Sequence, residues 1–73
     1  MKSLYETAEE AMMEVINTGE TFTFRDLHTA GDRATKTPGF AYRPADRLLQ
    51  RLRRDGVIEL VGYRIWKKVK VNA

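Results

Sequence analysis

The sequence has no cysteine, one histidine and one serine among its 73 residues, and each scarcity argues against a class of protein. Without cysteine there is neither a disulfide framework nor a thiolate metal site, which is compatible with a reducing cytosol. His28 has no clustered carboxylates beside it, and Ser3 lies at a predicted helix start, so neither a metal site nor a serine nucleophile is supported. No glycine-rich phosphate loop occurs. We therefore expect no enzyme and no cofactor.

Long apolar runs are also missing. No stretch approaches the roughly 20 apolar residues of a membrane span, and the first ten residues lack the apolar core of a signal peptide. We expect a cytoplasmic protein that does not contact a membrane. Its length permits one domain, residues 1–73, and a content of 42% hydrophobic and 32% charged residues is typical of a chain that folds.

Charge is distributed unevenly along the chain. Residues 1–35 hold three basic and seven acidic side chains, whereas residues 36–73 hold ten basic and three acidic ones. This polarity predicts an acidic face and a basic face on one small domain. Polyanions are the expected partners of the basic face.

The first predicted helix begins after Ser3, which together with Glu6 matches a capping box, and ends at Gly19. One side of its helical wheel carries apolar residues: Leu4, Ala8, Ala11, Met12, Val15 and Ile16. The opposite side carries Glu6, Glu9, Glu10 and Met13.

A short extended segment, residues 21–23, can add one strand. Thr23 is the expected N-cap of a second helix, which runs from Phe24 to about Ala30 and ends or bends at Gly31. Residues 32–42 contain Pro38-Gly39 and small polar residues, and they are predicted to form a loop.

The third predicted helix has Pro44 in its first turn, runs to Asp55 and is capped by Gly56. Its apolar stripe consists of Ala45, Leu48, Leu49 and Leu52. A hairpin follows, with strands 57–60 and 63–66 and a turn at Val61-Gly62. This register pairs Ile58 with Ile65, Val57 with Trp66, and Glu59 with Arg64 as an ion pair.

The order of helix, short strand, two helices and hairpin resembles the winged-helix variant of the helix-turn-helix family. The stretch that carries the resemblance is residues 48–59, LLQRLRRDGVIE: a leucine-bearing helix, a glycine and two aliphatic residues entering the wing. The resemblance covers nearly the whole chain and implies an α+β fold with a DNA-binding third helix. One departure is the long connection between the second and third helices, which implies either a longer second helix or an elaborated loop.

The basic face of the third helix is the predicted contact surface. On a helical wheel, five side chains lie opposite the leucine stripe: Arg43, Arg47, Gln50, Arg51 and Arg54. Arginine can bridge phosphates or the acceptors of guanine, and glutamine can pair with adenine. We expect Arg43, Arg47 and Gln50 to read bases of double-stranded DNA, and Arg51 and Arg54 to contact phosphates.

Flanking residues extend this predicted surface. In the loop, Lys36 and Thr37 are candidates for phosphate contacts, as are Lys67 and Lys68 in the hairpin. The hairpin aromatics Tyr63 and Trp66 are expected in or beside the core, and so are the three phenylalanines. Tyr42, beside the start of the third helix, is a weaker candidate for a phosphate contact.

Two alternatives remain open at this stage. The arginines can be a solvated face that covers apolar surface. The chain can also be a protein-interaction module, of the kind used by phage inhibitors or adaptors, whose acidic first helix binds a partner through Glu6, Glu9, Glu10 and Met13. Family members often bind palindromic DNA as homodimers, although no heptad seam marks an interface here. The favoured hypothesis is a small transcriptional regulator or DNA accessory factor of bacterial or phage type.

Overall fold

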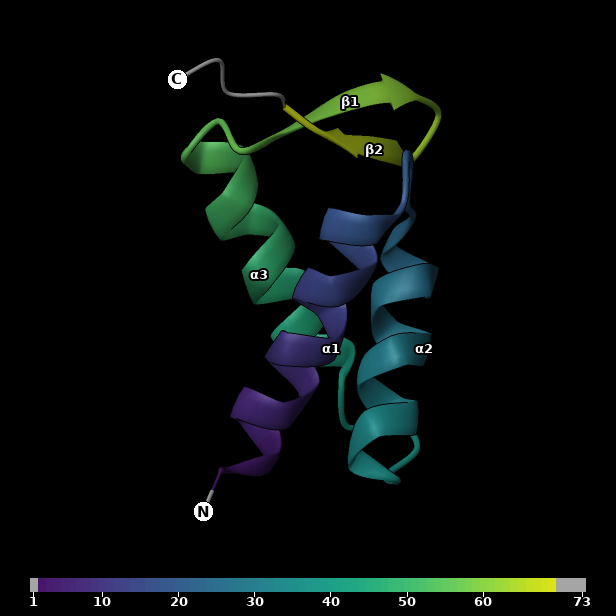
Figure 1. Ribbon diagram of the computed structural model, residues 1–73, viewed down its shortest axis with the longest axis vertical. Coiled ribbons are helices and arrows are strands. Elements are labelled where there is room, and N and C mark those ends of the chain that lie inside the picture. Colours follow the sequence, from purple (N-terminus) through teal and green to yellow (C-terminus); the bar gives the residue numbers. More distant parts are fainter. Residues whose placement is uncertain (1, 70–73) are drawn as a thin grey trace.

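A computed structural model describes residues 2–69 and contains three helices followed by a two-stranded hairpin. The elements are α1 (Leu4–Thr18), α2 (Phe24–Thr35), α3 (Tyr42–Arg54), β1 (Ile58–Gly62) and β2 (Ile65–Lys68). This arrangement confirms the predicted α+β class and is consistent with a winged-helix layout. The hairpin lies across one end of the helices, and α1 begins at the opposite end (Figure 1).

Local sequence signals set the helix ends. The Ser3 hydroxyl accepts the Glu6 N–H at 3.1 Å, as the capping-box pattern predicts. Thr23 and Asp26 form a complete capping box, with hydrogen bonds of 2.9 and 3.1 Å. At the end of α3, Gly56 takes a positive φ of 73° and donates to the Arg53 carbonyl. The next N–H, from Val57, reaches the Leu52 carbonyl at 2.9 Å, which completes a Schellman motif.

The second helix is longer than predicted. It continues through Gly31 to Thr35, so the expected loop 32–42 shortens to residues 36–41. Gly31 does not end the helix because it is a packing position. A Cβ there would lie 2.5 Å from the Cβ of Ala41 and 2.7 Å from the Cε of Met12. The close approach of three chain segments at Gly31 therefore outweighs its low helix propensity.

One hydrophobic core joins all these elements. Ala8, Met12 and Ile16 of α1 are buried as predicted, whereas Leu4, the first residue of the predicted stripe, is 50% exposed. The other buried apolar residues are Phe22, Leu27, Ala41, Ala45, Leu48, Leu52 and Ile58. Phe24, Phe40, Leu49 and Trp66 are partly buried and pack against this core. The apolar side of α3 is thus anchored as expected, which leaves its basic side outside.

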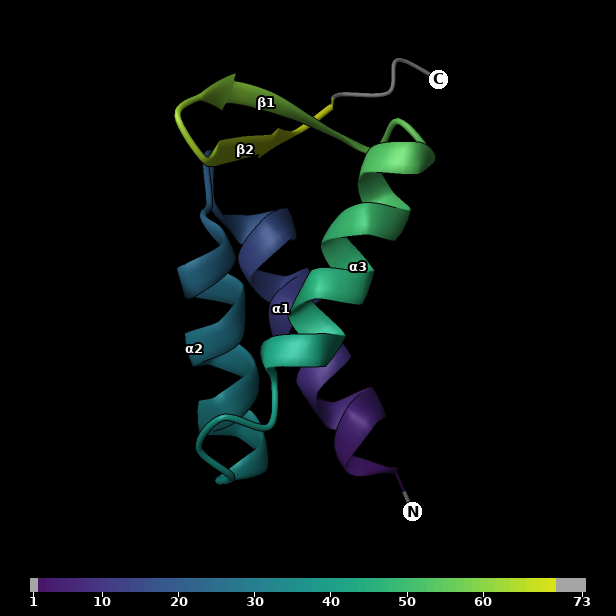
Figure 2. The same ribbon diagram turned by 180° about the vertical axis from the view of Figure 1, so that it is seen from behind.

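The predicted extended segment at residues 21–23 contributes one bridge to the sheet. Phe22 and Trp66 exchange two backbone hydrogen bonds, of 2.9 and 2.8 Å. Strand β2 therefore lies between Phe22 and β1. Figure 2 shows β2 on the side of the helices and β1 on the outer side. This bridge ties the hairpin to the connection between α1 and α2.

The predicted hairpin register is wrong. Glu59 aligns with Lys67, Leu60 with Trp66, and Gly62 with Ile65, so the turn falls at Tyr63 and Arg64. Arg64 has a φ of 55°, which places a non-glycine residue in the left-handed region, and a strand irregularity lies between Leu60 and Gly62.

The observed register agrees with contacts that lie outside the turn. Ile58 is buried in the core and Trp66 exchanges two backbone hydrogen bonds with Phe22, and the observed register satisfies both contacts. Tyr63, expected near the core, is 83% exposed, whereas Trp66 packs against the core as predicted.

Within residues 2–69, no helix combines the length and the apolar character that crossing a membrane requires.

Candidate nucleic-acid interface

All five predicted contact residues of α3 are exposed. They are Arg43, Arg47, Gln50, Arg51 and Arg54. We call this set the arginine face. It lies opposite the buried Ala45, Leu48 and Leu52, so the amphipathic pattern of the sequence places it correctly. Basic residues in the last turn, including Arg51 and Arg54, also suit the negative end of the helix dipole.

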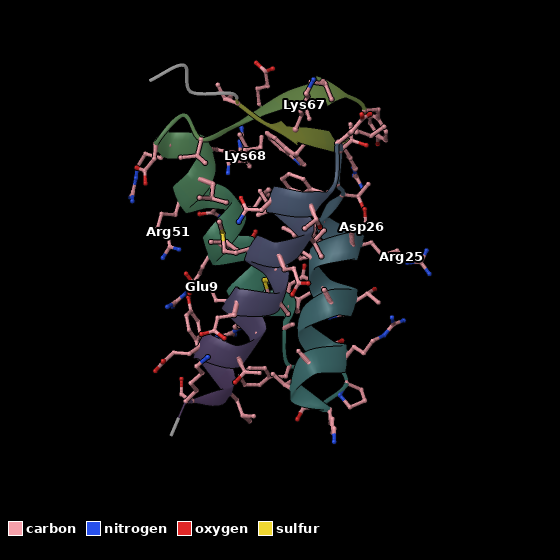
Figure 3. All side chains as sticks on the ribbon, viewed as in Figure 1. Glu9, Arg25, Asp26, Arg51, Lys67 and Lys68 are labelled. Atoms are coloured by element: carbon pink, nitrogen blue, oxygen red, sulfur yellow. The ribbon has the colours of Figure 1, made fainter. Side chains whose placement is uncertain are left out.

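Arg51 is already engaged within the molecule. Its Nη2 donates to Oε1 of Glu9 on α1 at 2.5 Å, and the two side chains meet on one flank of the molecule in Figure 3. The hydrogen bond from Arg51 to Glu9 raises the pKa of Arg51 above its ordinary value. Arg51 is charged at neutral pH, as arginine ordinarily is, and an external anion would have to compete with Glu9 for it.

Two further members of the arginine face have partners on α3 or at its end. Gln50 Nε2 donates to Oδ2 of Asp46 at 3.0 Å. Arg54 Nε lies 3.6 Å from Oδ1 of Asp55, and both side chains are largely exposed. These contacts are surface pairs in water, so they hold the side chains only weakly.

Arg43 and Arg47 differ from the rest. Neither forms an ion pair or a side-chain hydrogen bond with another residue of the described range 2–69. They lie one helical turn apart in the N-terminal half of α3, so their guanidinium groups leave the same side of the helix. Two neighbouring arginines without carboxylate partners form a positive site open to an external anion.

An aromatic groove adjoins these two arginines. It encloses about 550 Å³ and is lined mostly by apolar surface. Its lining consists of Tyr5, Gly39, Phe40, Tyr42, Arg43, Pro44 and Arg47. Tyr5 comes from the first turn of α1, and the other residues come from the start of α3 and the connection before it. No pattern in the sequence predicts this groove, because only packing brings Tyr5 beside α3.

Asp32 of α2 fixes the chain just before α3. Its carboxylate accepts the N–H of Gly39 at 3.0 Å and the N–H of Ala41 at 2.8 Å. These two backbone hydrogen bonds lower the pKa of Asp32, and the nearby His28 adds a smaller effect in the same direction. Nε2 of His28 lies 3.2 Å from Oδ2 without hydrogen-bond geometry, and this contact is an ion pair only when the imidazole carries a proton. Asp32 thus orients the turn of α3 that bears Arg43.

We expect Asp32→Asn to lower the melting temperature at pH 7 by about 5–10 °C, because the amide keeps one acceptor oxygen and loses the charge. The pKa of Asp32 is lowered on folding, so its contribution is fully present above the ordinary pKa of 3.8. It is lost as the pH falls through the depressed folded pKa. Thermal melts of both proteins from pH 7 to pH 2 should therefore converge at the acid end.

The matched control for this prediction is Asp46→Asn. Asp46 is exposed and accepts only the side chain of Gln50. Its melting temperature should stay within a few degrees of wild type. An unchanged melting temperature for Asp32→Asn would show that the backbone of residues 39–41 does not depend on the Asp32 carboxylate.

The flanking candidates occupy different environments. Lys36 caps α2 in a left-handed conformation with an exposed side chain, and the Thr37 hydroxyl donates to the Thr35 carbonyl at 3.1 Å. Lys68 Nζ donates to Oδ1 of Asn17 at 2.6 Å. Lys67 is exposed beside Glu59, and Figure 3 shows it on the outer side of the hairpin. None of the four lines the two hollows that adjoin the arginine face.

The predicted ion pair of Glu59 with Arg64 is absent, since the observed register places Lys67 opposite Glu59. Arg64 instead lies over the ring of Tyr63 at 5.2 Å. Arg53, which the sequence analysis did not single out, contacts the hairpin instead. Arg53 lies 4.8 Å from the centre of the Trp66 ring and links α3 to β2.

The acidic side of α1 forms a second surface. A depression of about 650 Å³ is lined by Glu6, Glu9, Glu10, Met13, Glu14, Asn17 and Thr18. Met13 is partly buried against the core instead of exposed as predicted. Lys2 pairs with Glu10 at 2.8 Å, and Glu9 pairs with Arg51, so two of these carboxylates have cationic partners.

Comparisons with protein-family models, curated proteins and solved structures find no match to this chain.

Proposed function

We propose that this protein binds double-stranded DNA through the arginine face of α3, as a small regulator or accessory factor of bacterial or phage type working in the cytoplasm. The observation that carries the proposal is the pair Arg43 and Arg47. Both side chains are exposed, and neither has a partner among the described residues. An α-helix fits the major groove, where arginine can donate two hydrogen bonds to guanine.

Roles within the arginine face follow from the contacts of each side chain. Arg43 and Arg47 read bases because they lie in the N-terminal half of α3, which approaches bases most closely in this class of fold. Gln50 reads an adjacent base once it leaves Asp46. Arg51 and Arg54 contact phosphates. An exposed ion pair such as Arg51–Glu9 is worth about 0–1 kcal/mol, so a phosphate that offers a stronger field can displace Glu9.

The test is binding to a pool of random duplexes followed by selection at physiological salt. Because each neutralised phosphate contributes about −0.9 to the slope of log affinity against log salt, wild type should show a steep negative slope. We expect Arg51→Ala to weaken binding to all duplexes and to flatten that slope by about one unit. Fluorescence anisotropy of a labelled duplex at several salt concentrations measures both quantities.

Arg25→Ala is the matched control, since Arg25 is an exposed arginine on α2 that projects from the opposite flank (Figure 3). It should change neither the slope nor the affinity appreciably. Equal slopes for all three proteins would contradict the assignment of Arg51 to a phosphate. If wild type binds no duplex and instead captures one protein in stoichiometric amount, the alternative of a protein-interaction module replaces the DNA proposal.

A further inference from the structure

We infer that the aromatic groove between α1 and the start of α3 binds an unpaired nucleobase, so that the protein prefers DNA with a short single-stranded segment beside the duplex. This inference rests on the proposed function, because DNA on the adjoining arginine face supplies the base. It adds a neighbouring site, which shares Arg43 and Arg47 with the major-groove contacts and recognises its base by stacking.

The lining of the groove defines its ligand. Three aromatic side chains contribute to it, namely Tyr5, Phe40 and Tyr42. Tyr5 is 38% exposed and Tyr42 is 59% exposed, so both rings offer surface to a ligand, whereas Phe40 packs partly against the core. Planar rings that stack on aromatic side chains are the natural occupants of such a surface, and every nucleobase has a face of this kind.

Charge complementarity restricts the ligand further. Arg43 and Arg47 also line the groove, and no described carboxylate pairs with either. The occupant should therefore carry a planar ring together with negative charge. A nucleotide has both, with the base on the aromatic surface and its phosphate at guanidinium N–H groups that a bidentate base contact leaves free, since each guanidinium has five donors. A purely apolar ligand would make no use of the two cations at the rim.

The aromatic groove lies where a nucleotide of DNA bound to the arginine face can reach it. The groove continues along α3 into a second depression lined by Tyr5, Arg47, Gln50, Arg51 and Arg54. Tyr5 and Arg47 are thus shared by both hollows. A strand leaving a duplex held on the arginine face would reach the aromatic groove without crossing the hairpin, which lies at the other end of the molecule (Figures 1 and 2).

The experiment compares three DNA probes by fluorescence anisotropy. They are a blunt duplex, the same duplex with a three-thymidine overhang, and that duplex with three abasic residues in place of the thymidines. The two overhangs carry equal numbers of phosphates, so their affinity ratio isolates the bases. We expect wild type to bind the thymidine overhang at least about tenfold more tightly than the abasic one.

Variants of Tyr5 test whether the difference in affinity between the thymidine and abasic overhangs arises in the aromatic groove. Tyr5→Leu keeps apolar bulk but removes the ring, and it should bring the ratio close to one. Tyr5→Phe keeps the ring and should preserve the ratio. Tyr63→Leu is the matched control, because Tyr63 is an 83% exposed tyrosine at the hairpin turn. Circular dichroism melts verify that all variants fold.

Each outcome bears on one proposal. Equal affinities of wild type for both overhangs would overturn the inference and leave duplex binding intact. A ratio that survives Tyr5→Leu would overturn the assignment to this groove. Failure to bind the blunt duplex, with tight binding of the thymidine overhang, would support the groove and overturn the proposed duplex site.

Discussion

Replacing Arg43 and Arg47 together by alanine should remove most of the sequence preference and leave only the contribution of Gln50. The two side chains have no partners among residues 2–69, so their removal breaks no described contact within the protein. Each bidentate contact with a base contributes about 1–3 kcal/mol of discrimination. If the two contributions add, affinity for the preferred duplex falls at least roughly 30-fold. Affinity for random duplexes should fall much less, because base contacts carry the difference between them.

The measurement is anisotropy with the duplex obtained by selection and with a scrambled duplex of equal length. A double variant on α2, Arg25→Ala with Arg33→Ala, removes the same charge from exposed positions outside the arginine face. It should retain the preference for the selected duplex. Equal losses on both duplexes would mean that Arg43 and Arg47 contact only phosphates. No loss on either would remove α3 from the DNA interface.

Phe22→Ala should produce the largest loss of stability. The Phe22 side chain is 1% exposed and is the largest fully buried one in the core. Truncating a buried phenylalanine costs about 3–5 kcal/mol, because it loses apolar transfer energy and leaves a cavity. Domains are stable by only about 5–15 kcal/mol, and a chain of this length belongs near the lower end. We therefore expect this variant to be largely unfolded at 37 °C.

Urea unfolding followed by circular dichroism measures this loss. Alanine retains the two backbone hydrogen bonds to Trp66, so the change reports side-chain packing and not the bridge itself. Tyr63→Ala is the control, since it removes a large ring from an exposed position and should alter stability by no more than about 0.5 kcal/mol. A loss below about 1 kcal/mol for Phe22→Ala would contradict its place in the core.

Local patterns in the sequence were sufficient for the helices and their caps. Ser3 and Thr23 accept N–H groups of the first turns because short polar side chains satisfy donors that a helix leaves free. The alternation of leucine and arginine along residues 43–54 fixed which side of α3 is exposed, since burial of the leucines leaves the arginines no other side. The arginine face was therefore predictable residue by residue.

Long-range contacts decided what the sequence could not. Gly31 has the low helix propensity of a terminator, yet it lies inside α2 because only glycine fits between Met12 and Ala41. The hairpin register differs from the predicted one, and two contacts outside the turn accompany it. Phe22 bonds to Trp66 of β2, and Ile58 anchors β1 in the core. The preference of Val61-Gly62 for a turn contributes less to the choice of register than these tertiary contacts do.

The same division applies to the candidate site. Composition and helical spacing by themselves determined a helix with one basic and one apolar side. The period of 3.6 residues is a local property of the sequence, so it can be recognised without knowing what the helix packs against. Only the tertiary structure decided that Arg51 meets Glu9, that Arg43 and Arg47 stay unmatched within residues 2–69, and that Tyr5 joins them in an aromatic groove. These side chains come from α1 and α3, and packing of the two helices alone sets the distances between them.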